Sequence, residues 1–277
     1  MAYEKLGATP LDYAPCRYGA SKLLFRGPER ALTGRYAAFL GGTETYGKFI
    51  RRPFPALVED RLGAPCVNLG WPNAGADVFL HDHDVLAAAS MAQVTVLQVA
   101  GAQNMSNRFY TVHPRRNDRF VQATSVLRAI FSEVDFTEFH FTRHMLGYLA
   151  HVGPDRFALL RLELQEAWVA RMKLLVDRID APVVLLWMSS HPPQDRADVP
   201  GIAEDPAFVT CAMLRALAGC TAGIVDATAN SAARLSGTQG MVHSEFEAVA
   251  AAELLGPAAH DAAAEALLPI MRKYLGD

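Results

Sequence analysis

Short apolar runs that end in glycine or polar residues alternate with longer stretches of helical periodicity along this chain. The runs occupy residues 36–40, 66–69, 94–100, 183–188 and 224–225. Continuous Val, Ile and Leu, without an apolar–polar alternation, are typical of strands that are covered on both faces, as in parallel sheets. The chain is therefore expected to contain about five buried parallel strands.

Between these runs, apolar residues recur at helical spacing. The predicted helices cover residues 49–62, 77–91, 155–179, 206–218 and 260–274. Strands that alternate with helices predict a doubly wound α/β fold of the flavodoxin-like kind, with three layers and right-handed crossovers. In such folds the ligand site lies beyond the carboxyl ends of the strands. The residues that follow each apolar run are therefore the first candidates for a functional site.

Two segments depart from this rhythm. Residues 1–34 are interpreted as an N-terminal arm packed on the domain. Residues 105–150 are polar, basic and aromatic at their start, and far longer than the usual connection of about 2–6 residues. We interpret them as an insertion, or a lid, within a single α/β domain that spans residues 1–277.

Composition narrows the class of protein. Hydrophobic residues make up 51% of the chain, charged residues 20%, and the formal net charge is −3. This balance gives no electrostatic reason to expect a nucleic-acid or anionic-membrane partner. No apolar run approaches the ~20 residues that span a bilayer, and the first 15 residues do not resemble a signal peptide. Four widely spaced cysteines without a CxxC pair indicate reduced, mostly buried thiols in a cytoplasmic protein.

The turn after the first run reads GGTETYGKF over residues 41–49. Glycines permit a tight strand-to-helix turn whose amides point at an anion or oxyanion. The segment resembles the opening motif of SGNH (GDSL-type) hydrolases, G-D-S-x-T-x-G. Gly41, Thr45 and Gly47 match that motif, while Gly42 replaces its Asp and Thr43 its nucleophilic Ser.

The resemblance continues in chain order. Asn68, Gly70 and Gly75 resemble the second block of these hydrolases, and residues 101–104 (GAQN) resemble their G-x-N-D block. It implies that Gly75 supplies an oxyanion-hole amide, that Gln103 falls at the position of the family's oxyanion-hole Asn, and that Asn104 falls at the position of its Asp. The last-helix region, with His260 three residues after Pro257, resembles the region that carries the family's catalytic His. His243, in GMVHS, is the alternative base.

The chemistry implied is ester hydrolysis or acyl transfer without a metal or an organic cofactor. Thr43 would attack an ester carbonyl while His260 or His243 takes its proton, because a hydroxyl nucleophile needs a base within hydrogen-bond reach. Gly42, Gly75 and Gln103 or Asn104 would hold the developing negative charge. The competing structural interpretation is that Thr43 and Thr45 simply cap the next helix.

A different interpretation treats the same turn as a phosphate cradle. Residues 42–48 satisfy the G-x-x-x-x-G-K part of a P-loop, but Phe49 stands where a magnesium-binding Ser or Thr is needed. A sulfotransferase-like enzyme needs no magnesium. In that case Lys48 and the arginines at 115, 116 and 119 would hold a nucleotide donor's phosphates.

The remaining candidates are binding residues and metal ligands. Arg108, Arg115 and Arg119 stand among aromatic residues and could bind an anionic or sugar ligand above the site. The sequence 81–84 (HDHD) is interpreted as a solvated helix start, and His140 and His144 lack the glutamate of an HExxH motif, so no metal is expected. The leading prediction is an SGNH-like esterase or acyltransferase acting on a small-molecule, lipid or carbohydrate ester. A non-catalytic ligand-binding protein of the same fold is the third possibility.

Overall fold

A computed structural model of the chain describes residues 11–195 and 202–276. Its centre is a five-stranded sheet in the order β2-β1-β3-β6-β7, in which all neighbours pair in parallel. The strands are β1 (Ala37–Gly41), β2 (Cys66–Gly70), β3 (Val94–Gln98), β6 (Val183–Trp187) and β7 (Gly223–Asp226). The α/β class, the five parallel strands and the flavodoxin-like order expected from the sequence are thereby confirmed.

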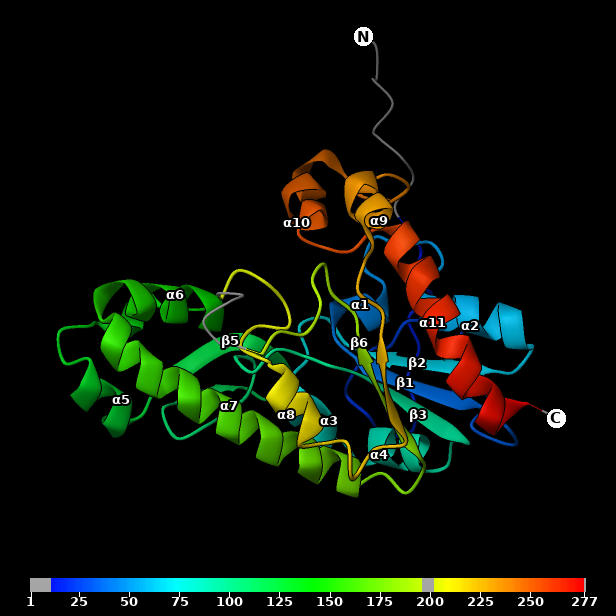
Figure 1. Ribbon diagram of the computed structural model, residues 1–277, viewed down its shortest axis with the longest axis horizontal. Coiled ribbons are helices and arrows are strands. Elements are labelled where there is room, and N and C mark those ends of the chain that lie inside the picture. Colours follow the sequence, from blue (N-terminus) through cyan, green and yellow to red (C-terminus); the bar gives the residue numbers. More distant parts are fainter. Residues whose placement is uncertain (1–10, 196–201, 277) are drawn as a thin grey trace, which may run out of the picture.

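Helices cover both faces of this sheet, as Figure 1 shows. One face carries α2 (Phe54–Leu62) and α11 (Pro257–Leu275), and the other carries α3 (Ala76–Leu80), α4 (His83–Ser90), α7 (Pro154–Asp177) and α8 (Cys211–Arg215). Alternate strand residues enter different cores: Phe39 and Val96 face α11, whereas Leu40 and Leu97 face α4 and α7. The continuous apolar runs therefore exist because both faces are buried.

Three predicted helices differ from the observed ones, each for a local reason. The helix expected from residue 49 begins only at Phe54, after Pro53, and Phe49 itself has a positive φ of 67°. The stretch 77–91 is split into α3 and α4, because the Asp82 side chain accepts a hydrogen bond from Val85 N and starts a new helix. The stretch 206–218 forms only the short α8, whose N-cap is Thr210.

The segment expected to be an insertion does contain structure of its own. It holds an antiparallel pair, β4 (Tyr110–His113) and β5 (Arg116–Ala123), followed by α5 (Ser125–Ile130), the 3-10 turn η1 (Phe136–Glu138) and α6 (Thr142–Val152). Figure 1 shows these elements, with the first half of α7, extending away from the central sheet. The short helices α9 (Ser231–Ser236) and α10 (Ala248–Ala252), with the 3-10 turn η2 (Glu245–Glu247), precede α11.

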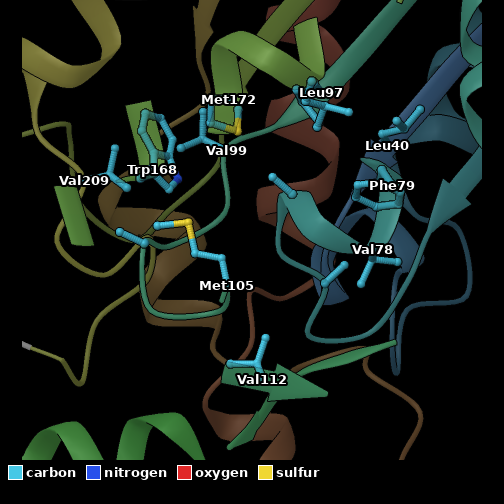
Figure 2. Close-up of a cluster of buried hydrophobic side chains, with 14 of the residues drawn as sticks. Leu40, Val78, Phe79, Leu97, Val99, Met105, Val112, Trp168, Met172 and Val209 are labelled. Carbon is cyan, nitrogen blue, oxygen red and sulfur yellow. The ribbon is translucent and has the colours of Figure 1, made fainter. Parts of the chain in front are cut away.

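The larger core lies under α7, where Trp168 fills the space between the helix and the strand ends (Figure 2). Trp168 is 2% exposed, and its indole Nε1 donates to Ala100 O at 2.8 Å. The carbonyl of Ala100 immediately precedes the turn at residues 101–104. Packing under α7 thus holds one of the turns at the carboxyl edge of the sheet.

The segment interpreted as an N-terminal arm contacts the rest of the chain through a buried arginine; residues 1–10 lie outside the described part of the chain. Arg26 is 6% exposed and donates to the carbonyls of Tyr46, Gly47 and Arg51. These carbonyls belong to the last residue of the helical turn 43–46 and to the loop that follows it. The arm therefore fixes the loop between that turn and α2.

Not all cysteines are buried as the sequence suggested. All four are free, but only Cys66 is buried; Cys16 and Cys211 are half-buried and Cys220 is exposed. Burial raises the pKa of the Cys66 thiol far above its ordinary value. The exposure of Cys220 follows from its place in the turn after α8, beyond the helix predicted over residues 206–218.

Glu59 on α2 links the arm to β2 and gives a testable pH dependence. Its carboxylate accepts hydrogen bonds from Arg30 and from Cys66 N (2.8 Å). Partial burial would raise the pKa of Glu59, but these hydrogen bonds outweigh it and lower the pKa below its ordinary value. A lowered pKa adds stability that is present above the ordinary pKa and lost as the pH falls through the lowered one.

We therefore expect Glu59→Gln to lower the free energy of unfolding at pH 7 by about 1 kcal/mol. The difference from the wild type should shrink as the pH falls below about 4. Urea denaturation at pH 7 and at acidic pH measures both effects. A difference that stays constant down to pH 3 would contradict this assignment.

Candidate functional site

Gln98, at the end of β3, organises the turn that follows β1. Its side-chain oxygen accepts hydrogen bonds from Gly42 N (3.1 Å), Thr45 N (3.1 Å) and Thr45 Oγ1 (2.6 Å). A Cβ atom at Gly41 would lie 2.1 Å from Thr45 Oγ1, so this close approach requires glycine there. Gln98 thus satisfies the amides that a helix cap would satisfy in α1 (Thr43–Tyr46), whose N-cap Gly42 has no side-chain cap.

Thr43 consequently has no capping role, and the Thr45 hydroxyl is bonded to Gln98, so the alternative interpretation that these two threonines simply cap the helix does not hold. Its half-buried hydroxyl donates to Asn73 Oδ1 (3.1 Å) and accepts from Asn73 N (3.0 Å). Asn73 lies in the turn after β2 with a positive φ of 57°, a conformation that asparagine adopts more readily than most residues. The turns after β1 and β2 therefore meet at the Thr43 hydroxyl.

A carboxylate stands behind this pair. Asn73 Nδ2 donates to Asp118 Oδ2 at 3.2 Å, so one chain of hydrogen bonds runs from Thr43 through Asn73 to Asp118 on β5. Desolvation raises the pKa of Asp118, although Arg119, Asn73 and Arg116 act in the opposite direction. We call Thr43, Asn73 and Asp118 the edge triad.

Two further groups close the same region. Asn104 Oδ1 accepts from Thr142 Oγ1 at 3.1 Å, and its Nδ2 makes a long contact of 3.5 Å with Asn73 O. Thr142 Oγ1 also lies 3.3 Å from Asp118 O. The turns after β1, β2 and β3 thus gather with β5 and the start of α6 around one polar cluster.

Gly75 and Gln103 do not occupy the roles expected of them. Gly75 N donates to the buried Asn117 Oδ1 at 3.0 Å, so this amide is already occupied. Gln103 is 2% exposed, and its Nε2 donates to Asp205 Oδ1 at 3.2 Å. The amide of Gly42 is likewise bonded to Gln98. In this geometry, Asn104 is the predicted oxyanion group that reaches the edge triad.

His260 is brought to α1 but not to Thr43. The imidazole is fully buried in α11; its Nδ1 accepts from Phe54 N at 3.2 Å, and its Nε2 lies 3.4 Å from Glu44 Oε2. Because Nδ1 acts as an acceptor, the ring hydrogen of the neutral form is on Nε2 and faces Glu44. The polar contacts of His260 are therefore with Phe54 and Glu44. This corrects the prediction that His260 is the base of Thr43.

His243 is not bonded to Thr43 either. Its ring packs edge-on against Phe49 with centroids 5.9 Å apart, and its Nδ1 lies 3.0 Å from Ser244 O. Among the described residues, Asn73 is the sole side chain in hydrogen-bond contact with the Thr43 hydroxyl. The expected threonine–histidine pair is thus absent from the described part of the chain.

The predicted arginines face different partners. Arg108 forms an ion pair with Glu163 at 2.7 Å, and the Arg119 guanidinium lies 4.2 Å from the centre of the Phe141 ring. Arg115 is exposed, and its carbonyl accepts from Trp71 Nε1 at 2.6 Å. The Trp71 contact joins the β4–β5 pair to the turn after β2, whereas Arg108 faces α7 and Arg119 faces the residue before α6.

The turn gives no support to a phosphate cradle. Its amides at residues 42 and 45 bond to Gln98, and those at 46, 47 and 48 bond to carbonyls of Gly42 and Thr43. Lys48 Nζ lies 4.6 Å from the centre of the Phe49 ring. Most of the donors that a phosphate would need are therefore already used inside the turn.

Several residues of this site were missed from the sequence. They lie in a turn or in the predicted insertion, where polar residues are common and do not by themselves indicate a site. These residues are Asn73, Asn117, Asp118 and Thr142. The position of Asn73 in the sequence could have marked it as a candidate, because it follows the second apolar run at the edge where the carboxyl ends of the strands meet. Asp118 stands among the arginines at 115, 116 and 119, where the sequence does not distinguish a partly buried carboxylate from a solvated one.

Two grooves on the surface lie away from the edge triad. A groove of about 660 Å³ lies between the ends of α7 and α8, lined by residues such as Leu174 and Cys220. A smaller one of about 110 Å³ lies beside Arg26 and Arg30. Residues 11–195 and 202–276 contain neither a helix suited to crossing a bilayer nor a group of three or more potential metal ligands.

Solved structures similar to this one include three esterases or lipases. A lipase from a goat rumen metagenome aligns over 85% of this chain and 97% of its own, with 11% identity and a TM-score of 0.44. A variant of Axe2, an acetylxylan esterase from Geobacillus stearothermophilus, aligns over 88% and 95%, with 13% identity and a TM-score of 0.42. A family two carbohydrate esterase from Clostridium thermocellum aligns over 92% and 68%, with 11% identity and a TM-score of 0.46.

No curated protein matches this sequence. A family model, by contrast, matches residues 1–275, which is nearly the whole chain. The chain therefore belongs to the family described as domain of unknown function DUF6473.

Proposed function

We propose that this protein breaks or transfers an ester bond, with the Thr43 hydroxyl as the nucleophile. The observation that carries the proposal is the freedom of this hydroxyl from helix capping. Gln98 takes the capping role, while Asn73 holds the half-buried Thr43 Oγ1 at the carboxyl edge of the sheet. This position is also where the SGNH-like opening motif places its nucleophile.

The proposed reaction forms an acyl-threonine intermediate. Thr43 Oγ1 attacks the ester carbonyl carbon, and the bond from that carbon to the oxygen of the leaving alcohol breaks. The proton of the Thr43 hydroxyl passes through a solvent water molecule to that leaving oxygen. Water, or the hydroxyl of an acceptor molecule, then releases the acyl group. Asn104 Nδ2, whose contact with Asn73 is long, is the side-chain donor that supports the oxyanion.

The surroundings of Thr43 favour a polar ester over a long-chain lipid. Asn73, Asn104, Asp118 and Thr142 provide amides, a carboxylate and a hydroxyl within one connected cluster. Such groups orient a ligand that carries hydroxyls, since each can donate or accept a hydrogen bond. A short acyl ester of a carbohydrate or another hydroxylated small molecule is therefore the proposed substrate class.

Hydrolysis of p-nitrophenyl acetate by matched variants tests this function. Thr43→Val keeps the shape but removes the hydroxyl, and we expect it to lower kcat/KM by about 100-fold or more. Thr43→Ser keeps the hydroxyl and should retain activity. Wild-type hydrolysis no faster than buffer, or equal rates for the wild type and Thr43→Val, would overturn the proposal.

A specific observation favours a second candidate, a binding protein without turnover. Both hydrogen bonds of the Thr43 hydroxyl go to Asn73, and no imidazole contacts it among residues 11–195 and 202–276. In that case an acetylated oligosaccharide should raise the melting temperature without being hydrolysed. Thr43→Val would then weaken this stabilisation, whereas a catalytic site would also lose turnover.

A further inference from the structure

Within the described part of the chain, Asp118 is the one acidic side chain that is hydrogen-bonded to the Thr43–Asn73 pair. It lies on β5, 45 residues from Asn73 in sequence, and accepts from Asn73 Nδ2 at 3.2 Å. The other face of the Asn73 amide, its Oδ1, accepts from the Thr43 hydroxyl. One planar amide therefore separates a carboxylate from the proposed nucleophile.

We propose that Asp118 is a positioning residue for Thr43: its carboxylate holds the Asn73 side chain with the oxygen, instead of the nitrogen, toward the Thr43 hydroxyl. The consequence for catalysis rests on the proposed function of Thr43. The orientation of Asn73 itself does not depend on that function.

The argument begins with the chemistry of the two groups. An ionised carboxylate only accepts hydrogen bonds, whereas a carboxamide has one donating end and one accepting end. A charged Asp118 therefore requires the Nδ2 end of Asn73, which leaves Oδ1 for Thr43. Because Asn73 N already donates to Thr43 Oγ1, the hydroxyl must place its own hydrogen on Oδ1.

Protonation of Asp118 would remove this requirement. A neutral carboxyl group can donate as well as accept, so either end of the Asn73 amide could face it. If the amide turns by half a revolution, Nδ2 faces Thr43 Oγ1 and the hydroxyl loses its acceptor. The direction of the Thr43 hydrogen is therefore coupled to the charge of Asp118.

The charged groups around Asp118 define where this coupling occurs. Arg116 and Arg119 on its own strand favour the charged form, but desolvation is the larger effect and raises the pKa of Asp118. From the turn after β2 the facing group is Asn73, and from α6 it is Thr142, which contacts the Asp118 carbonyl. Nearby Arg143 is instead paired with Asp205 at 2.6 Å.

Nuclear magnetic resonance of asparagine side-chain amides tests the inference without any measurement of activity. The protein is labelled with ¹⁵N on asparagine only, and the Asn73 signal is assigned by its loss in Asn73→Ser. We expect this signal to shift with pH around a midpoint above the ordinary aspartate pKa of about 3.9. The pH-dependent shift should disappear in Asp118→Asn. It should persist in Glu138→Gln, which removes an exposed charge from the same segment, residues 105–150.

An Asn73 signal that does not change with pH in the wild type would overturn the inference. This measurement does not depend on whether the Asp118→Asn variant folds. A shift that is unchanged in Asp118→Asn would overturn it as well. If Thr43 is the nucleophile, Asp118→Asn should also lower kcat/KM for p-nitrophenyl acetate by about tenfold or more and alter its pH profile. Absence of Thr43-dependent hydrolysis would remove the proposed function, while the amide titration would still decide the role of Asp118.

Discussion

Replacement of His260 by alanine is expected to lower the free energy of unfolding by about 3–5 kcal/mol. The imidazole is fully buried and stacks on Phe54, with ring centroids 6.0 Å apart. Its removal leaves a cavity between α11 and α2, leaves Phe54 N without an acceptor, and deprives Glu44 of the facing ring hydrogen. Urea denaturation monitored by circular dichroism measures the loss.

This result separates a structural histidine from a catalytic base. A base is poised at a reactive group and its loss impairs turnover before it impairs folding, whereas His260 connects α1, α2 and α11. His151→Ala is the matched control, because this histidine is exposed at the end of α6 and should change stability by less than about 0.5 kcal/mol. If His260→Ala remained as stable as the wild type but abolished Thr43-dependent hydrolysis, the assignment of His260 to the core would be wrong.

Replacement of Trp168 by alanine is expected to cost a similar amount, about 3–5 kcal/mol. Trp168 is 2% exposed and lies among Val99, Met105 and Met172 (Figure 2). Truncation would leave a large cavity under α7 and remove the hydrogen bond from Nε1 to Ala100 O. Because Ala100 precedes the turn that carries Asn104, we also expect reduced Thr43-dependent activity in the fraction that remains folded.

Two further variants make this second prediction specific. Trp168→Phe keeps most of the apolar volume and should lose less stability than Trp168→Ala. Leu162→Ala lies on the same helix, but its side chain is 55% exposed, so its effect should stay within about 0.5 kcal/mol. Equal losses for Trp168→Ala and Leu162→Ala would show that the core under α7 does not support the sheet edge.

Glu44, the acidic residue that follows Thr43, attaches α1 to the C-terminal part of the chain. Glu44 accepts from Leu255 N at 3.1 Å and faces His260, so α1 is anchored to the segment before α11. Asn73 and Asp118 anchor the same turn from the opposite side. The proposed nucleophile is thus held between two polar attachments, one through Glu44 to the residues around α11 and one through Asn73 to Asp118, which favours a fixed hydroxyl.

The apolar pattern by itself determined the architecture of this protein. The run 183–188 is apolar at every position because both faces of the sheet are covered, and this property is visible without any tertiary information. It also placed the turn of Thr43 at the carboxyl edge. Helix boundaries were less predictable, since Asp82 and Thr210 start helices through side-chain hydrogen bonds whose geometry depends on the loops before them.

Only the tertiary structure decided which side chains meet at that edge. Asn73 lies 30 residues beyond Thr43 in the sequence, and Asp118 lies 75 residues beyond it. His260 lies 206 residues from Phe54, whose backbone N–H donates a hydrogen bond to it. Hydrogen bonds extend about 3 Å, so a shift of one turn in α11 or one residue in β5 exchanges the partner of each polar group. Residue type and order along the chain therefore identified the Thr43 hydroxyl as a candidate, whereas burial and register placed His260 in the core and Asp118 beside Asn73.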